Sequence, residues 1–445
     1  MTTLNSWPKL TGREEFRFLS ELVFTRSAGD HTVVSLRDQH GGTTRFANNQ
    51  VVQNVDSRCG TLTVTVSFGC KHGTASTTDF TAGSVQETLV RAERLARLSP
   101  EDPEYLPPPD PQQHLTLPTV REESRAAGPA RRLEYAGEAI GQCRMENLSA
   151  AGIVGSSVGA IGVAASTGLF AHEERTEARF SVTVQDGEAT GWASATHRSI
   201  DHLKVQERTL AAIAKAKRGE EIRDLPPGMY PVILEPAAAA GLWTWMLWSL
   251  DAKAYDKGTS PFSGRLGQRI VDARLSLDNV SAHEDLLGVG FTPDGLATGP
   301  SRWIDRGVLQ QLSYDRYTAN AHRIRSLPTL DAPCVSAEGA AAQSVQELIK
   351  NTKRALLITN FWYIRPVNAF DLTLTGMTRD GTFLVEEGQI VSAVKNLRFH
   401  ESPLRAFNQV EACTRPLEAV TSETGKMLVP AMVLNAFHFS SATRF

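Results

Sequence analysis

The segment from Phe361 to Phe399 constrains the fold most strongly, because runs of strand-forming residues alternate in it with turn residues. Asp380-Gly381 and Glu387-Gly388 are dipeptides that favour tight turns. Pro366 is expected to end the first run, since proline cannot donate a hydrogen bond within a sheet. The expected strands are, in chain order, Phe361–Ile364, Leu372–Thr375, Thr382–Val385 and Ile390–Val394. The segment therefore predicts an antiparallel meander.

Similar signals upstream predict both strands and helices. Patterns typical of a helical capping box occur at Thr11–Glu14, Ser84–Glu87 and Ser344–Glu347. Further strands are expected at Val33–Leu36, Thr44–Val52, Thr61–Phe68, Arg179–Val184, Gly191–Ala195 and Pro231–Leu234. Asn48-Asn49 favours a turn or the end of a strand, with a ligand contact as the alternative.

The chain is expected to divide at Leu225–Gly228, where two adjacent prolines and a glycine interrupt the pattern. A length of 445 residues is sufficient for two domains. We predict an α+β protein in which residues 1–225 form an antiparallel sheet with helices. Residues 226–445 are predicted to form a mostly β domain with packed helices.

Ser149–Phe170 is uncharged over about the length of a bilayer span, which is roughly 20 residues. The segment consists largely of glycine, alanine and serine and is too weakly apolar to partition well into lipid. Its glycines fit turning strands. We therefore expect a buried hairpin and no membrane span.

Composition and charge exclude several classes of protein. The 46 basic and 49 acidic residues give a formal charge of −3, which does not favour binding to nucleic acid or an anionic membrane. The five cysteines are scattered without a CxxC pair, so a disulfide framework or a cysteine-rich zinc site is not expected. The start MTTLNSWPKL lacks the basic and apolar regions of a signal peptide, and we expect a cytoplasmic protein.

A helix expected from Pro236 to about Ala254 contains Trp243, Trp245 and Trp248. Residues 243 and 245 point about 200° apart on a helix, so these side chains cannot share one face. A helix that is apolar all round is usually buried in a core. Tryptophan is also enriched in the cores of interfaces, so one side could pack against a partner subunit. The two interpretations are compatible.

The meander also contains polar residues that could bind a substrate. An exposed strand edge can add an extended peptide, and an arginine beside it can bind a carboxylate through two hydrogen bonds. The alternative is that Arg379 and Asp380 only stabilise a turn and a local ion pair. The candidate substrate-binding residues are Tyr363, Arg365, Thr375, Arg379 and Asp380.

Several of these stretches carry a family resemblance. The sequences WYIR, TGMTRDGTFL and VKNLRF within residues 362–399 resemble the C-terminal domain of the TldD/TldE (PmbA) family of two-subunit metallopeptidases. TRFANNQVVQN, SPEDPEYLPP and SPFSGRLGQRI, further upstream, extend the resemblance over nearly the whole chain. Several long motifs in the same order are more specific than one short pattern.

The resemblance implies an HExxxH zinc motif in the catalytic member of the family, on the helix that follows a strand like PVILEP. Two histidines about one turn apart can bind one zinc ion, and the glutamate activates water. Here that helix reads PAAAAGLWTWMLWSLDAKAY and has no histidine, glutamate or cysteine in its interior. The His-Glu pairs at 172–173, 283–284 and 400–401 are not followed by a second histidine at the required spacing. We expect no catalytic residue and no metal ligand in this chain, which resembles the TldE-type subunit.

The resemblance further implies a heterodimer with a homologous TldD-like HExxxH subunit that holds the zinc. The pair would enclose a cavity that admits extended peptide, and this chain would shape the cavity and position the substrate while being inactive alone. One alternative is a regulatory or binding protein that acts without proteolysis. Another is a subunit of a complex that tailors a peptide-derived natural product.

Overall fold

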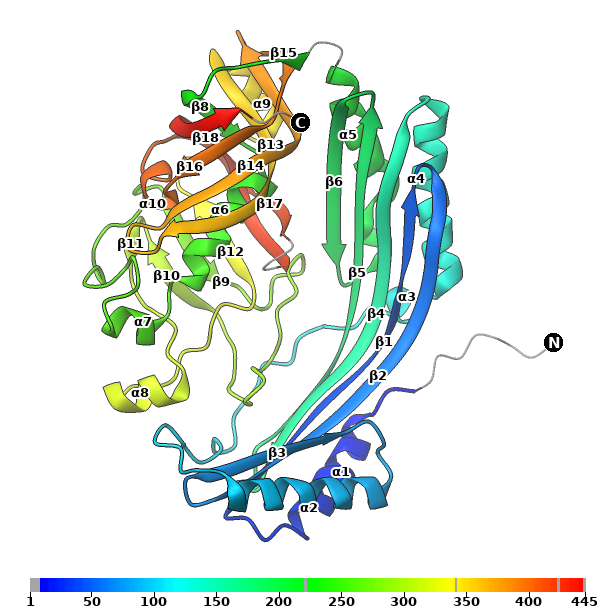
Figure 1. Cartoon of the computed structure of the whole chain (residues 1–445), viewed down its shortest axis with the longest axis vertical. Coiled ribbons are helices and arrows are strands. Elements are labelled where there is room, and N and C mark those ends of the chain that lie inside the picture. Colours follow the sequence, from blue (N-terminus) through cyan, green and yellow to red (C-terminus); the bar gives the residue numbers. More distant parts are fainter. Residues whose placement is uncertain (1–8, 220–221, 341, 422–424, 443–445) are drawn as a thin grey trace, which may run out of the picture.

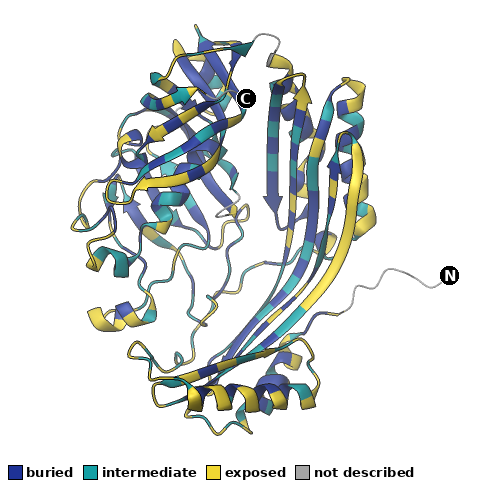
Figure 2. Cartoon of the chain, in the orientation of Figure 1, coloured by how far each residue is buried: buried dark blue, intermediate teal, exposed yellow. Residues whose placement is uncertain are grey.

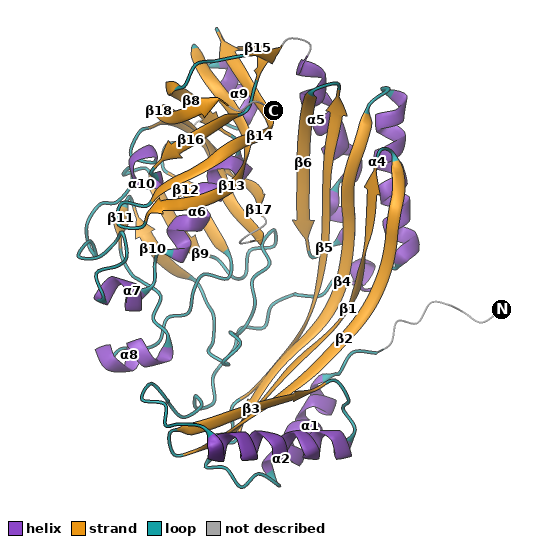
Figure 3. Ribbon diagram, in the orientation of Figure 1, coloured by secondary structure: helices purple, strands orange, loops and turns teal. Residues whose placement is uncertain are grey.

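A computed structural model describes residues 9–219, 222–340, 342–421 and 425–442. Two sheets organise the chain (Figure 1). The first is antiparallel, with six strands in the order β3-β2-β1-β4-β5-β6, and the second is mixed and has twelve strands. Strands and helices occur in both halves (Figure 3), so the predicted α+β class is confirmed.

The first sheet is built around a long hairpin of β1 (His31–Ala47) and β2 (Gln50–Phe68). Asn48 and Asn49 form its turn with φ angles of 49° and 59°, a left-handed conformation that asparagine tolerates. The predicted strand Thr44–Val52 is therefore wrong as one element, because it runs through this turn. Asn49 also accepts a hydrogen bond from the Ala150 amide and donates one to the Leu148 carbonyl. These two bonds attach the turn to the start of β4.

The glycine-rich segment forms one long strand, β4 (Ser149–Ala165), and the returning strand is β5 (Phe170–Asp186), so the hairpin expected within Ser149–Phe170 is wrong in its bounds. A Cβ atom at Gly162 would lie 2.6 Å from the ring of Phe16, which explains why no larger residue fits there. Within the described residues, no helix is long and apolar enough to cross a membrane. The sheet is completed by β3 (Lys71–Thr77) and β6 (Ala189–His197).

Helices cover one face of this sheet and leave the other open (Figure 1). They are α1 (Arg13–Phe24), α2 (Ala82–Leu98), α3 (Glu122–Arg125), α4 (Pro129–Met145) and α5 (Val205–Ala216). The expected cap at Thr11 is wrong, since Gly12 precedes α1 without a side-chain cap. Thr11 instead donates from its amide and hydroxyl to the buried carboxylate of Asp38. Thr11 therefore binds a residue distant in the sequence and does not cap the helix that follows it.

The second sheet contains the predicted meander. It comprises β13 (Arg354–Asn368), β14 (Thr373–Glu386) and β15 (Gln389–Val394), which pair in that order. The expected end at Pro366 is wrong, because β8 pairs with β13 only at Leu356–Ile358 and leaves Pro366 on a strand edge. The expected turn at Asp380-Gly381 is also wrong, because β14 continues through it as a bulge.

The remaining elements surround this meander. The strands are β7 (Ile222–Arg223), β8 (Gly228–Leu234), β9 (Leu275–Asn279), β10 (Ser301–Asp305), β11 (Val308–Leu309), β12 (Pro333–Ala337), β16 (Leu397–Glu401), β17 (Val410–Thr421) and β18 (Gly425–Ala442). The helices are α6 (Pro236–Trp248), α7 (Ala252–Asp256), α8 (Arg316–His322), α9 (Val345–Lys350) and α10 (Pro403–Ala406). The cap predicted at Ser344 is confirmed, since its side chain accepts from the Glu347 amide.

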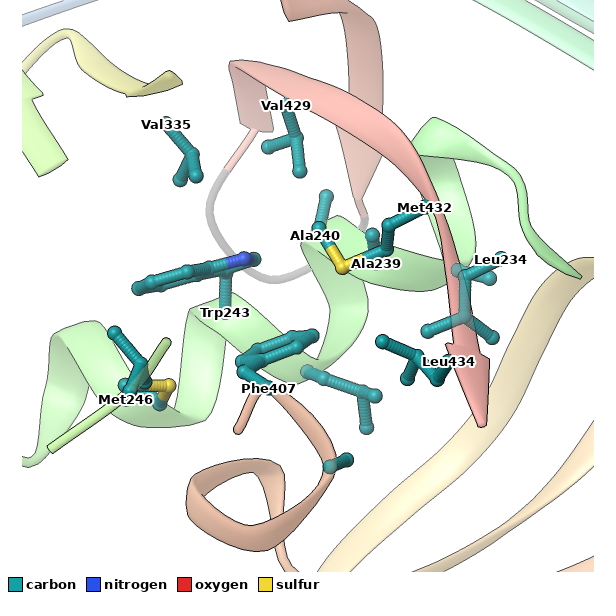
Figure 4. Packing of buried hydrophobic residues seen from close by; sticks show 14 of the residues in the cluster. Leu234, Ala239, Ala240, Trp243, Met246, Val335, Phe407, Val429, Met432 and Leu434 are labelled. Atoms are coloured by element: carbon teal, nitrogen blue, oxygen red, sulfur yellow. The ribbon is translucent and has the colours of Figure 1, made fainter. Parts of the chain in front are cut away.

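Helix α6 packs in the largest core of the chain (Figure 4). Trp243 is fully buried and stacks on Phe407, with 4.9 Å between the ring centroids. Trp248, on another face of the same helix, is 51% exposed. The helix is shorter than predicted, because Asp251 caps a separate helix, α7.

Replacing Trp243 with alanine should lower the free energy of unfolding by about 3–5 kcal/mol, since a large cavity would remain beside Phe407. Trp248→Ala on the same helix should cost less than about 1 kcal/mol, because that side chain is largely in water. Urea denaturation followed by circular dichroism measures both. Equal losses in the two variants would contradict the core position of Trp243.

Candidate functional site

The two sheets meet where β6 of the first half contacts β14 and β17 of the second and where α5 forms ion pairs with the second half, and we call this contact the sheet junction (Figure 1). Lys215 at the end of α5 forms an ion pair of 2.7 Å with Glu235, which precedes α6. Arg208 on α5 pairs with Glu418 on β17. Because the side chains of Lys215 and Glu235 are mostly buried, their charges are weakly screened by solvent.

Asp380 reaches the sheet junction from the bulge in β14. Its φ of 56° and that of 126° at Gly381 are positive values that accommodate the extra residue of the bulge. A Cβ atom at Gly381 would lie 2.7 Å from the Thr359 hydroxyl, so the bulge requires glycine. Burial raises the pKa of the Asp380 carboxyl, while Arg379, a hydrogen bond from Thr190 and the charge of Lys215 oppose that shift.

A pocket of about 470 Å³ lies at the sheet junction beside this bulge. Its walls come from both halves of the chain and include Thr190, Lys215, Gly381, Thr382 and Asn396. The Thr382 hydroxyl is buried and has no hydrogen-bond partner among the described residues. The pocket is therefore lined by a paired lysine from the first half and by residues of the β14 bulge from the second.

The five residues predicted to bind substrate do not converge on one point. Tyr363 and Arg365 lie on the exposed part of β13, where the guanidinium is 4.2 Å from the ring centroid. The Thr375 hydroxyl donates to the Phe399 carbonyl at 2.9 Å and is used in strand packing. Arg379 lies over the ring of Trp362 and is 3.7 Å from Asp380. A role for any of the five in substrate binding stays a prediction.

The three tryptophans of α6 differ in position. Trp243 lies in the core of this chain, whereas Trp245 and Trp248 form an edge-to-face pair with 5.2 Å between ring centroids. Gly241, Trp245 and Trp248 are spaced four and three residues apart and so share one face of the helix. At Gly241 this face meets Ile364 of β13. Beyond that contact, the Trp245–Trp248 pair reaches the surface.

The residues of α6 do not fit a zinc site. Trp243 Nε1 is buried without a hydrogen-bond partner in the part of the chain that the structure describes. An indole N–H only donates and has no lone pair for a metal. Elsewhere in residues 9–219, 222–340, 342–421 and 425–442, no three histidine, cysteine, aspartate or glutamate side chains are grouped as a metal site would require.

Models of protein families match most of the second half of the chain and part of the first. The model of the PmbA/TldA metallopeptidase C-terminal domain matches residues 227–441, and that of the central domain matches residues 122–219. The chain belongs to the PmbA/TldD family. A search of curated proteins finds no match.

Solved structures share the fold of this PmbA/TldD-family chain at low sequence identity. TldE from Thermococcus kodakarensis has a TM-score of 0.86 and 17% identity, and the match covers 96% of this chain and 98% of that one. A protein named as a candidate modulator of DNA gyrase from Thermotoga maritima has a TM-score of 0.84 and 16% identity, with 96% and 100% coverage. A similarly named protein from Bacteroides thetaiotaomicron has a TM-score of 0.82 and 16% identity, and the match covers 97% of this chain and 100% of that one. At such identities the likeness shows the fold alone.

Sequence reasoning missed a second group of ionisable residues at the sheet junction of this family member. Burial lowers the pKa of His197 to about 4, and the charges of Lys426 and His202 act in the same direction. The rings of His197 and His202 stack with centroids 4.5 Å apart. Asp285 lies 4.0 Å from His197 Nε2. No local pattern predicts this group, because Asp285 and Lys426 come from parts of the sequence distant from the two histidines.

The His197 pKa predicts a pH dependence of stability. A histidine whose pKa is lower in the folded state stabilises fully above about pH 6.5, and this contribution is lost as the pH falls toward about 4. Between about pH 7 and pH 4.5, the wild type should lose about 2 kcal/mol more than His197→Gln. Urea denaturation across this range measures the difference. The exposed-site variant His400→Gln should keep the wild-type profile, and identical profiles for all three proteins would contradict the assignment.

Proposed function

We propose that this chain is the non-catalytic subunit of a heterodimeric zinc metallopeptidase. In this proposal it shapes the cavity and positions extended peptide for a TldD-like partner that carries an HExxxH zinc motif. Membership of the PmbA/TldD family and its metallopeptidase domains supports the assignment to such a complex. The observation that carries the non-catalytic role is the composition of α6.

Helix α6 follows the strand β8, as the zinc-binding helix is expected to do in the catalytic member. Its interior carries only apolar side chains and a threonine, so no carboxylate activates water and no imidazole binds a metal. Trp243 fills the core beside Phe407 where polar ligands would otherwise need space. We therefore assign this helix a structural role in the core, and we assign zinc binding and peptide cleavage to the partner.

The same helix also provides a surface for that partner. Trp245 and Trp248 form an aromatic pair at the surface, and exposed tryptophans are typical of the centre of protein interfaces. We assign this Trp245–Trp248 pair to the contact with the TldD-like subunit. Trp243 is fully buried in the core beside Phe407 and so does not touch the partner.

The exposed part of β13 is suited to extended peptide. Its outward side chains Trp362 and Tyr363 are stacked with the guanidinium groups of Arg379 and Arg365. Peptide backbone can pair with a strand edge, aromatic rings can pack on its side chains, and an arginine can bind a carboxylate. This segment would hold substrate while the partner's zinc cleaves it.

The proposal is tested by purifying the chain alone and after co-expression with an HExxxH homologue from the same genome. The chain alone should contain no stoichiometric zinc and should not cleave an unfolded peptide. The complex should contain about one zinc per heterodimer and should cleave the peptide. Stoichiometric zinc or peptide cleavage by the chain alone would overturn the non-catalytic role, and failure of the two chains to associate would overturn the heterodimer.

Trp248→Glu should reduce recovery of the partner at least about tenfold in the same co-purification, because burying an unpaired carboxylate in an interface is strongly unfavourable. Phe18→Glu on α1 is the matched control, since Phe18 is also an exposed aromatic residue but lies in the other half of the chain. Equal recovery with both variants would show that the partner does not contact the Trp245–Trp248 pair.

A further inference from the structure

Four arginines without a charged partner lie on the open face of the first sheet. Arg37 and Arg45 belong to β1, and Arg175 and Arg179 belong to β5. Buried and more exposed residues alternate along these strands (Figure 2), and each arginine has a neighbour in sequence that is buried on the opposite, helical face. None of the four forms an ion pair or a side-chain hydrogen bond with another residue that the structure describes. Their guanidinium groups are therefore available to a ligand.

The four arginines flank one strand, because β4 lies between β1 and β5 in the sheet. The register of β1 places Arg37 and Arg45 beside the two ends of residues 153–161 of β4. The register of β5 places Arg175 and Arg179 beside interior positions of the same segment. This segment of β4 spans about 27 Å along the strand. We call its surface on the open face the β4 trough.

Small residues form the floor of the β4 trough. Between its ends, β4 turns only Gly155, Ser157 and Gly159 to the open face. A Cβ atom at Gly155 would lie 2.9 Å from both Cγ and Nε of Arg179, so glycine at this position lets the arginine lie across β4. A cavity of about 370 Å³ opens here, and its lining includes Gly155, Ser157 and Arg179. Glycine within a strand often marks a site where another backbone approaches closely.

One carboxylate lies within this positive surface. Glu177 stands on β5 between Arg175 and Arg179, and the register places it beside Ser157 at the middle of the β4 trough. Glu177 is exposed and has no ion-pair partner among the described residues. A complementary ligand therefore carries negative charge toward both ends of the trough and a neutral or positive group at its middle.

We infer that the β4 trough binds an extended acidic peptide whose central residue is neutral or basic. Successive side chains of an extended chain point to opposite sides, so the carboxylates of the peptide can reach the arginines of both β1 and β5. Arginine binds a carboxylate through two parallel hydrogen bonds. The identification of this peptide as a substrate rests on the proposed function, whereas its binding needs neither zinc nor a partner.

The β4 trough is less suited to nucleic acid, the other common ligand of clustered arginines. Proteins that bind single strands stack the bases on aromatic side chains, and the described lining of this cavity contains no aromatic residue. Glu177 would repel a phosphate at the middle of the trough. The formal charge of −3 on the whole chain gives no long-range attraction for a polyanion. A peptide is therefore the better occupant.

Fluorescence anisotropy of the purified full-length chain with a labelled peptide tests the inference. The peptide has about nine residues, the number that spans the trough, with two glutamates on each side of a central lysine. It should bind at least about tenfold more tightly than the same peptide with glutamine in place of each glutamate.

Arg179→Glu should weaken binding of the acidic peptide about fivefold, because an attraction becomes a repulsion. Arg94→Glu on α2 is the matched control, since Arg94 is also exposed and without an ion pair among the described residues but lies on the helical side of the sheet. This control should change the affinity by less than about twofold. Both positions are exposed, so melting temperatures should match the wild type.

A permuted peptide tests the position of Glu177. Exchanging the central lysine with a terminal glutamate keeps the composition and net charge but places a carboxylate beside Glu177. The permuted peptide should bind the wild type about fivefold more weakly, and Glu177→Gln should abolish most of this difference. A diffuse attraction between opposite charges would not distinguish the two peptides.

Several outcomes would overturn the inference. They are equal binding of the glutamate and glutamine peptides, an unchanged affinity in Arg179→Glu, equal binding of the permuted peptide, and tighter binding of a single-stranded oligothymidylate than of the acidic peptide. All of these measurements use the chain alone. A complex that contains no zinc or cleaves no peptide would therefore overturn the proposed function and leave this inference unchanged.

Discussion

The burial of α6 against the second sheet is the interaction on which most of this structure depends. Trp243 stacks on Phe407, and Leu234, Met432 and Leu434 enclose the same helix from neighbouring strands (Figure 4). The helix is apolar all round, so it can be stable only where protein surrounds most of its surface. Strands β8, β13 and β18 provide those surroundings, and α6 in turn orients the meander that follows.

Ion pairs at the sheet junction fix the position of the first half of the chain relative to the second. Glu235 stands at the start of α6 and binds Lys215 of α5, while Glu418 binds Arg208 from the same helix. Removing one partner of the Lys215–Glu235 pair would leave a poorly hydrated charge, which costs more than the pair itself contributes. The two sheets therefore hold a defined relative position, and the open face of the first sheet is turned toward the second half (Figure 1).

Local patterns predicted the elements whose stability is itself local. The Glu387-Gly388 turn and the cap at Ser344 were predicted, because each depends on residues a few positions apart. The bulge at Asp380 was mistaken for a turn, since the same Asp-Gly pair suits both and only the strands on either side distinguish them. Thr11 resembled a helix cap, but the buried carboxylate of Asp38 competed for its donors.

The sequence by itself determined the α+β class, the meander and the absence of an HExxxH motif from α6, because periodicity, turn chemistry and motif spacing are properties of short segments. Only the tertiary structure decided which tryptophan is buried, which carboxyl reaches the sheet junction and which strand edge lies free. Those properties depend on contacts between residues far apart in the chain. Lys215 and Asp380 are one example, since their proximity follows from how the two sheets pack and from nothing in either local sequence.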